Sequence, residues 1–124
     1  MATVHDDVRV NRSAVLLLLA LLVAGFGIWA SLNGIALLFG GGTPLLTVIF
    51  LAEGILGLVA AYGIARAQPW AATVVLLLAV IIAASALVQA FVLGILPWLY
   101  ALFIAIAAIV LALVIAAALG RSAV

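Results

Sequence analysis

Apolar and polar positions are distributed along this chain in long blocks. Four predominantly apolar stretches of roughly 20 to 26 residues are separated by short breaks, and a stretch of ~20 residues crosses a hydrocarbon core of ~30 Å. The predicted helices cover about 14–39, 44–66, 69–94 and 97–119. Membrane β-strands need segments of ~10 residues with alternating polarity, which these stretches lack. The pattern therefore predicts four membrane-spanning helices.

The breaks carry residues that are typical of helix ends. Thr43 suits the N-cap and Pro44 the first helical position, while Gly94 suits the residue just past a helix. Because the connections are only about three to five residues long, consecutive helices must be antiparallel neighbours. We therefore expect an all-α membrane protein, folded as an up-down-up-down bundle of four transmembrane helices.

Composition agrees with this pattern and narrows the class of protein. Hydrophobic residues make up 73% of the 124 residues and charged residues 6%, and the mean hydropathy is +1.70. Soluble domains are about half apolar and a quarter charged, so a water-soluble fold is excluded. We expect residues 1–13 to form a cytoplasmic N-terminal tail and residues 14–124 to form a single four-helix membrane domain.

All the basic residues lie at one side of the predicted bundle. They are Arg9 and Arg12 before the first helix, Arg66 between the second and third, and Arg121 after the fourth. The other two connections are uncharged, so the positive-inside rule places both termini in the cytoplasm of a multi-pass protein of the cell membrane. Trp70 is expected at the inner interface and Trp98 at the outer one, so these arginines and tryptophans serve as topology and lipid anchors.

Small residues recur at four-residue spacing in the predicted helices. Examples are Gly57 with Ala61 in the second helix and Ala86 with Ala90 in the third. Helices in lipid gain little from hydrophobicity against one another, so small residues that allow close approach favour packing. These four positions are predicted to pack against another helix, of the same chain or of a partner.

Glu53 is the one acidic residue inside the predicted spans. A carboxyl group in hydrocarbon needs a partner, a proton or a function. At 1.5 Å per residue, Glu53 lies about 12 Å, Asn33 about 9 Å and Tyr100 about 5 Å below the outer helix ends. Gln89 and Ser85 share one face of the third helix at about 7 to 14 Å. Every predicted helix therefore contributes a polar side chain to one outer layer.

Two interpretations of this polar layer stay open. In the structural one, Asn33, Gln89 and Tyr100 satisfy a protonated Glu53 through interhelical hydrogen bonds that contribute about 0.6 to 2 kcal/mol each. In the functional one, the same residues form a site for a proton, a cation or a ligand head group, open to the outer side.

The remaining chemistry of the sequence argues against an enzyme. The chain has no cysteine, and its single histidine, His5, lies outside the predicted spans. A nucleophile paired with a base, a pair of carboxylates and a set of metal ligands are all missing from the predicted bundle. The net charge of +1 supplies no basic field for nucleic acid. We therefore expect neither a metal nor a cofactor.

Residues 53–58, 62–66 and 68–71 carry a resemblance to small, uncharacterised four-helix membrane proteins of high-GC bacteria and some archaea. In those proteins a glycine-rich second helix ends in a basic turn, followed by Trp-Ala at the start of the next helix. The resemblance implies the fold and no activity.

The segment 51–53 followed by Gly57 is also similar to the start of the glutamate helix in small multidrug resistance transporters, which are four-helix dimers. In that family the glutamate lies on the first helix, whereas Glu53 lies on the second. The lysine that ends the family's glutamate helix has no counterpart here. The chain is therefore not assigned to that family.

These observations lead to two hypotheses about function. The first is a non-enzymatic polytopic membrane protein, an accessory or scaffold subunit or a self-associating bundle, whose partners are the lipid bilayer and other membrane helices. The alternative is a minimal transporter or ion-conducting oligomer that uses the membrane-buried Glu53 with Asn33, Gln89 and Tyr100.

Overall fold

The computed structural model describes the backbone of residues 2–123 and the side chains of residues 14–120. This part of the chain folds into four α-helices, in chain order α1 (Ala2–Phe39), α2 (Pro44–Ala65), α3 (Trp70–Phe91) and α4 (Trp98–Ala123). Each contains 22 to 26 residues of mean hydropathy 2.1 to 3.2, long and apolar enough to cross a membrane. The predicted all-helical architecture is confirmed, and the four apolar helices indicate a multi-pass membrane protein.

Three helix ends differ from the predicted bounds by more than one residue. Residues 2–13, which we expected to precede the first helix, continue α1 in helical conformation, since no proline or glycine interrupts them. The third helix ends at Phe91, because Gly94 takes a positive φ of 65° and the N–H groups of Ile95 and Leu96 donate to the carbonyl of Gln89. The fourth helix continues past residue 119 to Ala123.

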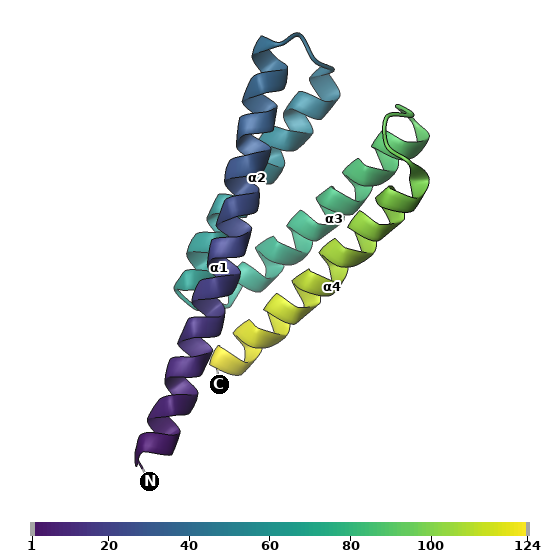
Figure 1. Cartoon of the computed structure of the whole chain (residues 1–124). Coiled ribbons are helices and arrows are strands. Elements are labelled where there is room, and N and C mark those ends of the chain that lie inside the picture. Colours follow the sequence, from purple (N-terminus) through teal and green to yellow (C-terminus); the bar gives the residue numbers. More distant parts are fainter. Residues whose placement is uncertain (1, 124) are drawn as a thin grey trace.

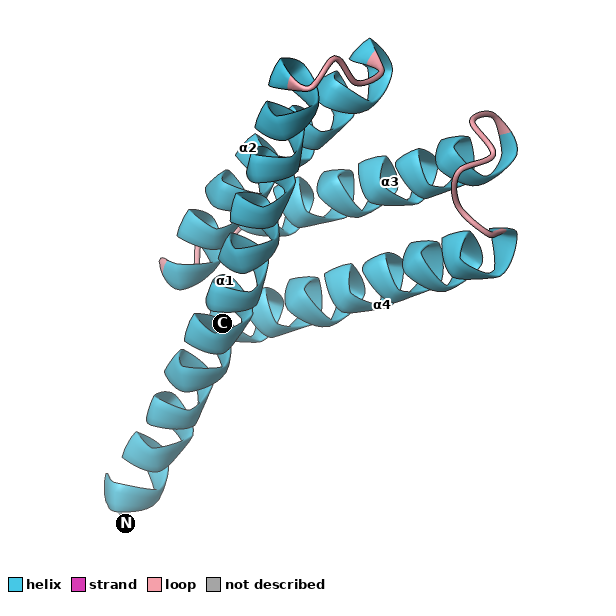
Figure 2. Cartoon of the chain, turned by 45° about the horizontal axis from the view of Figure 1, so that its top comes forward, coloured by secondary structure: helices cyan, strands magenta, loops and turns pink. Residues whose placement is uncertain are grey.

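The helices pair into two hairpins, an N-terminal hairpin of α1 and α2 and a C-terminal hairpin of α3 and α4. Contacts are extensive within each hairpin, fewer between α2 and α3, and slight between α1 and α4. Two views show the hairpins meeting near the α2–α3 turn and diverging toward their loops (Figures 1 and 2). The four helices therefore do not close into a complete bundle.

The N-terminal hairpin is held by contact between the backbones of its helices. A Cβ added at Gly57 would lie 2.9 Å from the Cα of Gly27, and one added at Gly54 would meet the hydroxyl of Ser31. Only residues without a Cβ allow such an approach, which brings many backbone atoms into van der Waals contact. Gly57, a predicted packing residue, lies in this contact.

All four helices contribute to one core where the hairpins meet. Ile64 of α2 and Ile115 and Leu119 of α4 are its largest fully buried side chains. Ala61 belongs to the same core, Ala86 is buried elsewhere on α3, and Ala90 is half-buried. The core thus joins the hairpins at one end and leaves the loop ends apart.

Candidate functional site

Glu53 is almost fully buried on α2, with 3% of its surface exposed. Its neighbours Gly54 and Gly57 bring the α1 backbone close to this part of α2. Among residues 14–120, Glu53 forms no hydrogen bond and no ion pair. In this part of the chain, every polar side-chain atom that is fully enclosed has a hydrogen-bond partner. Because the carboxyl oxygens of Glu53 have none, they must account for the small part of its surface that stays exposed. Among the side chains that the structure describes, Glu53 therefore supplies the one unpaired carboxyl group, and it lies in apolar surroundings.

Ser85 and Gln89 lie together one turn apart on α3. The amide Nε2 of Gln89 donates a hydrogen bond of 3.0 Å to the hydroxyl of Ser85. Ser85 is buried, with 4% of its surface exposed. These two candidate residues satisfy each other within one helix.

Asn33 and Tyr100 are not joined to Glu53. The amide of Asn33 donates to the backbone carbonyl of Trp29 on its own helix, at 2.8 Å, and Tyr100 is 64% exposed. The residues of the predicted polar layer lie in the halves of their helices nearer the α1–α2 loop and the α3–α4 loop. At these ends the two hairpins diverge (Figure 1). Similar depth along the helices therefore does not bring the five side chains into one hydrogen-bonded network in the described residues.

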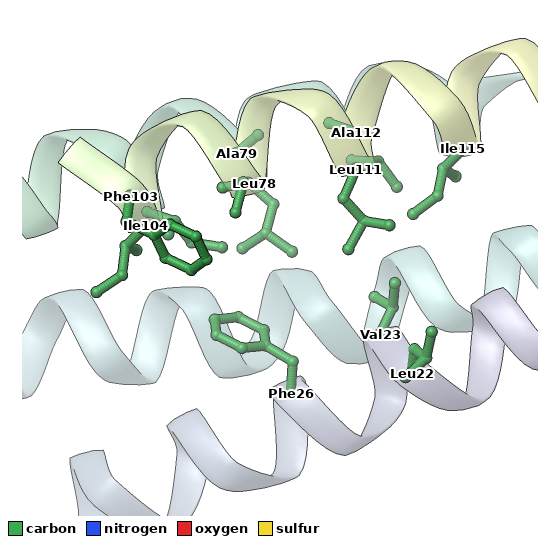
Figure 3. Close-up of a pocket in the computed structure, with 14 residues that line it drawn as sticks. Leu22, Val23, Phe26, Leu78, Ala79, Phe103, Ile104, Leu111, Ala112 and Ile115 are labelled. Carbon is green, nitrogen blue, oxygen red and sulfur yellow. The ribbon is translucent and has the colours of Figure 1, made fainter. Parts of the chain in front are cut away.

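A groove lies between α1 on one side and α3 and α4 on the other. Its volume is about 350 Å³, and all fourteen residues that line it are Ala, Val, Leu, Ile or Phe. Figure 3 shows Phe26 and Val23 of α1 facing Phe103 and Leu111 of α4 across the opening. The groove is open at the side, since the lining residues Leu22, Phe103 and Leu111 are exposed.

Sequence reasoning did not find this groove. Every residue that lines it belongs to an apolar stretch, so neither charge nor hydropathy distinguishes it from the rest of the helices. The one local signal is the pair of alanines at 107 and 108 together with Ala112, small residues of α4 that line the groove.

The predicted anchors that the structure describes lie at the surface. Arg66 lies over the ring of Tyr62, with its guanidinium carbon 5.4 Å from the ring centroid. Trp70 packs its ring against Gly63 and is partly exposed, as is Trp98. The side chains of the three other predicted anchors lie outside the described residues; these are Arg9, Arg12 and Arg121.

The chemistry available to this arrangement is limited. A lone carboxyl group can exchange a proton or attract a cation, whereas general acid–base catalysis also needs a positioned reacting group. The described residues contain no group of three or more His, Cys, Asp or Glu side chains placed to hold a metal ion. Comparison of the chain with known protein families, with characterised proteins and with solved structures finds no match.

Proposed function

We propose that this chain is a non-enzymatic multi-pass protein of the cell membrane that acts as an accessory or scaffold subunit or as a self-associating helical bundle. In this proposal the helices cross the bilayer in up-down-up-down order, with both termini and the Arg66 turn in the cytoplasm. The exposed position of Arg66 and the exposure of Trp70 and Trp98 fit roles at the two interfaces.

The open arrangement of the two hairpins carries this proposal. In the most apolar part of each helix at most 39% of the residues are buried, and in α4 the share is 22%. A closed four-helix bundle places each helix against two neighbours, whereas α4 packs chiefly against α3. Helices of a second protein, or of a second copy, would complete the packing that this chain leaves open.

Native mass measurement tests the proposal. The protein is extracted from its own membrane in a polymer disc, its mass is determined, and bound proteins are identified. Another membrane protein in fixed stoichiometry supports a subunit role, and a dimer or higher oligomer supports self-association. A monomer without partners at native expression levels would contradict the proposal.

A second candidate function is a minimal transporter or ion-conducting oligomer that uses Glu53. The observation in its favour is the buried carboxyl without a partner in the described residues. Such groups are expensive in a membrane and commonly mark proton or ion pathways.

Flux through liposomes under proton and cation gradients tests this candidate. Glu53→Gln should abolish a pH-dependent flux while leaving the helical fold intact. The matched control is Thr47→Val, which removes a buried hydroxyl of the same helix whose hydrogen bond goes to the carbonyl of Thr43. Absence of flux under every gradient, or equal flux from Glu53→Gln and Thr47→Val, would exclude a transport role for Glu53.

A further inference from the structure

The loop between α3 and α4 contains no polar side chain. It covers residues 92–97, and its side chains Val92 and Ile95 are 73% and 62% exposed. The loop between α1 and α2, residues 40–43, consists instead of three glycines and a threonine. We propose that the α3–α4 loop inserts into the bilayer at the boundary between the headgroups and the acyl chains, whereas the α1–α2 loop lies in water. This inference rests on the multi-pass topology proposed above and adds a contact with lipid at one loop.

Helix length places both loops close to this boundary. Helix α3 has 22 residues, and α2, which ends at the same turn, also has 22. At 1.5 Å per residue each spans about 33 Å, against a hydrocarbon core of ~30 Å. The two hairpins diverge (Figures 1 and 2), so at least one of them is tilted and its loop lies lower in the membrane. The chemistry of each loop therefore decides whether it lies in lipid or in water.

Apolar side chains also flank the α3–α4 loop. Phe91, directly before the loop, and Leu99, shortly after it, are exposed like Val92 and Ile95. An apolar surface of this kind is unfavourable in water and marks a site of contact with a membrane or with another protein. It continues onto α3 and α4, whose apolar surfaces face hydrocarbon in the proposed topology. The bilayer therefore reaches this surface without a gap and is the partner that fits it.

The backbone of the α3–α4 loop needs little water. Four of its N–H groups donate to carbonyls of the last turn of α3, at 2.9 to 3.3 Å, and Pro97 has no N–H. In the α1–α2 loop, the N–H groups of Gly41 and Thr43 have no backbone partner among the described residues. An unpaired backbone group is costly in hydrocarbon. The α3–α4 loop therefore tolerates contact with lipid, whereas the α1–α2 loop needs water.

The first turn of α4 fixes the depth of the loop. Its leading N–H groups precede the first helical bond, which Ala101 donates to Pro97, so they need other acceptors. Lipid ester carbonyls at the boundary supply these acceptors, whereas the acyl chains do not. Trp98 and Tyr100 lie in this turn and are exposed, and these residue types are enriched at the boundary. The loop therefore inserts to the level of the ester groups and no deeper.

Quenching of single fluorescent labels tests the depth of each loop. The chain has no cysteine, so Ile95→Cys, Thr43→Cys and Val80→Cys each carry one nitrobenzoxadiazole label in the full chain, reconstituted in palmitoyl-oleoyl-phosphatidylcholine vesicles. Thr43 makes no side-chain cap, and Val80 is an exposed residue in the middle of α3. Iodide on both sides of the membrane quenches from water, and a phosphatidylcholine with a nitroxide near the top of its acyl chain quenches from lipid.

We expect the label at residue 95 to lose most of its fluorescence to the nitroxide lipid and little to iodide, and the label at residue 43 to show the reverse. Stronger quenching by iodide at residue 95, or equal quenching of both loops, would overturn the inference. A label at residue 95 that neither quencher reaches would also overturn it, since a second copy of the chain would then cover the loop.

The label at residue 80 tests the topology on which the inference rests. Protection from iodide at residue 80, together with quenching by iodide at residue 95, would refute the inserted loop alone. Quenching by iodide at both residues would refute the membrane span as well.

Photolabelling of the wild-type chain avoids the substitutions. A phosphatidylcholine with a diazirine near the top of its acyl chain is activated in the same vesicles, and labelled peptides are identified by mass spectrometry. Labels on residues 91–99 support the inserted loop. Their absence there, with labels present elsewhere on α3 and α4, would contradict it.

Discussion

Substitution of Gly27 by alanine tests whether the N-terminal hairpin depends on backbone contact. The added Cβ would lie 2.9 Å from the backbone nitrogen of Leu58, 3.0 Å from the carbonyl oxygen of Gly54 and 3.2 Å from the carbonyl carbon of Gly57. All three are backbone atoms, so no side-chain rotation relieves the overlap. Helix α1 must move away from α2 to accommodate the methyl group.

The loss of stability in Gly27→Ala can be estimated by comparison with Gly25→Ala, a matched variant on the same helix. Non-bonded atoms prefer separations of about 3.5 to 4.0 Å, so the helices must separate by about 0.5 to 1 Å. Overpacking of this kind costs about 1 to 3 kcal/mol. Alanine also gains about 1 kcal/mol of helix propensity over glycine, and Gly25→Ala receives that gain alone, since nothing lies within 4 Å of its added Cβ. The difference between the two variants isolates the packing cost.

Reversible unfolding of both variants by SDS in mixed micelles measures that difference. Far-ultraviolet circular dichroism follows the helices. In a background with Trp70→Phe and Trp98→Phe, fluorescence of Trp29 follows the hairpin, because its ring contacts Phe50 of α2 edge-on, with 5.8 Å between the ring centroids. We expect Gly27→Ala to unfold with a free energy lower than that of Gly25→Ala by about 1 to 3 kcal/mol. Equal stability of the two variants would show that the helices adjust without cost and would refute the reasoning.

Two further predictions concern the core and the turn at Arg66. Ile115→Ala should lower the free energy of unfolding by about 2 to 5 kcal/mol, since Ile115 is 1% exposed. Ile109→Ala, at a position 44% exposed on the same helix, should change it by about 0.5 kcal/mol or less in the same SDS titration; equal effects would contradict the assigned core. Arg66→Ala should cost at most about 1 kcal/mol in that assay, because a cation–π contact at an exposed site contributes about 0.5 to 1 kcal/mol. A larger loss would assign Arg66 a structural role beyond its contact with Tyr62.

The four helices were predictable because their signals are local. Pro44 begins α2 as expected, Pro69 and Pro97 lie directly before α3 and α4, and the glycines of the breaks fall between helices. The end of α3 was less accessible to sequence reasoning. Gly94 was expected to follow the helix directly, but the hydrogen bonds of Ile95 and Leu96 to Gln89 form a longer turn, and this geometry depends on several residues together.

The candidate site was less predictable than the fold. The depth of a residue below the outer helix end follows from counting residues. The hydrogen-bond partner of its side chain depends instead on which faces of the helices turn toward each other. Periodicity assigns faces where polar and apolar residues alternate, and these helices are apolar on every side. Asn33 therefore bonds to its own helix at a position where sequence reasoning expected a partner across the bundle. Gly54, which meets Ser31 in the α1–α2 contact, was missed for the same reason.

In this fold, the residues that stabilise the chain differ from those that are free to associate with other molecules. Backbone contact at Gly27, Gly54 and Gly57 holds α1 to α2, and the core around Ile64 and Ile115 joins the hairpins at one end. Neither contact covers the exposed face of α4, which packs chiefly against α3. Substitutions in the glycine contact should therefore lower stability, whereas large side chains on the exposed face of α4 should weaken association with little loss of stability. A variant of that face that unfolded the chain but left the association of the folded fraction intact would show that this division is wrong.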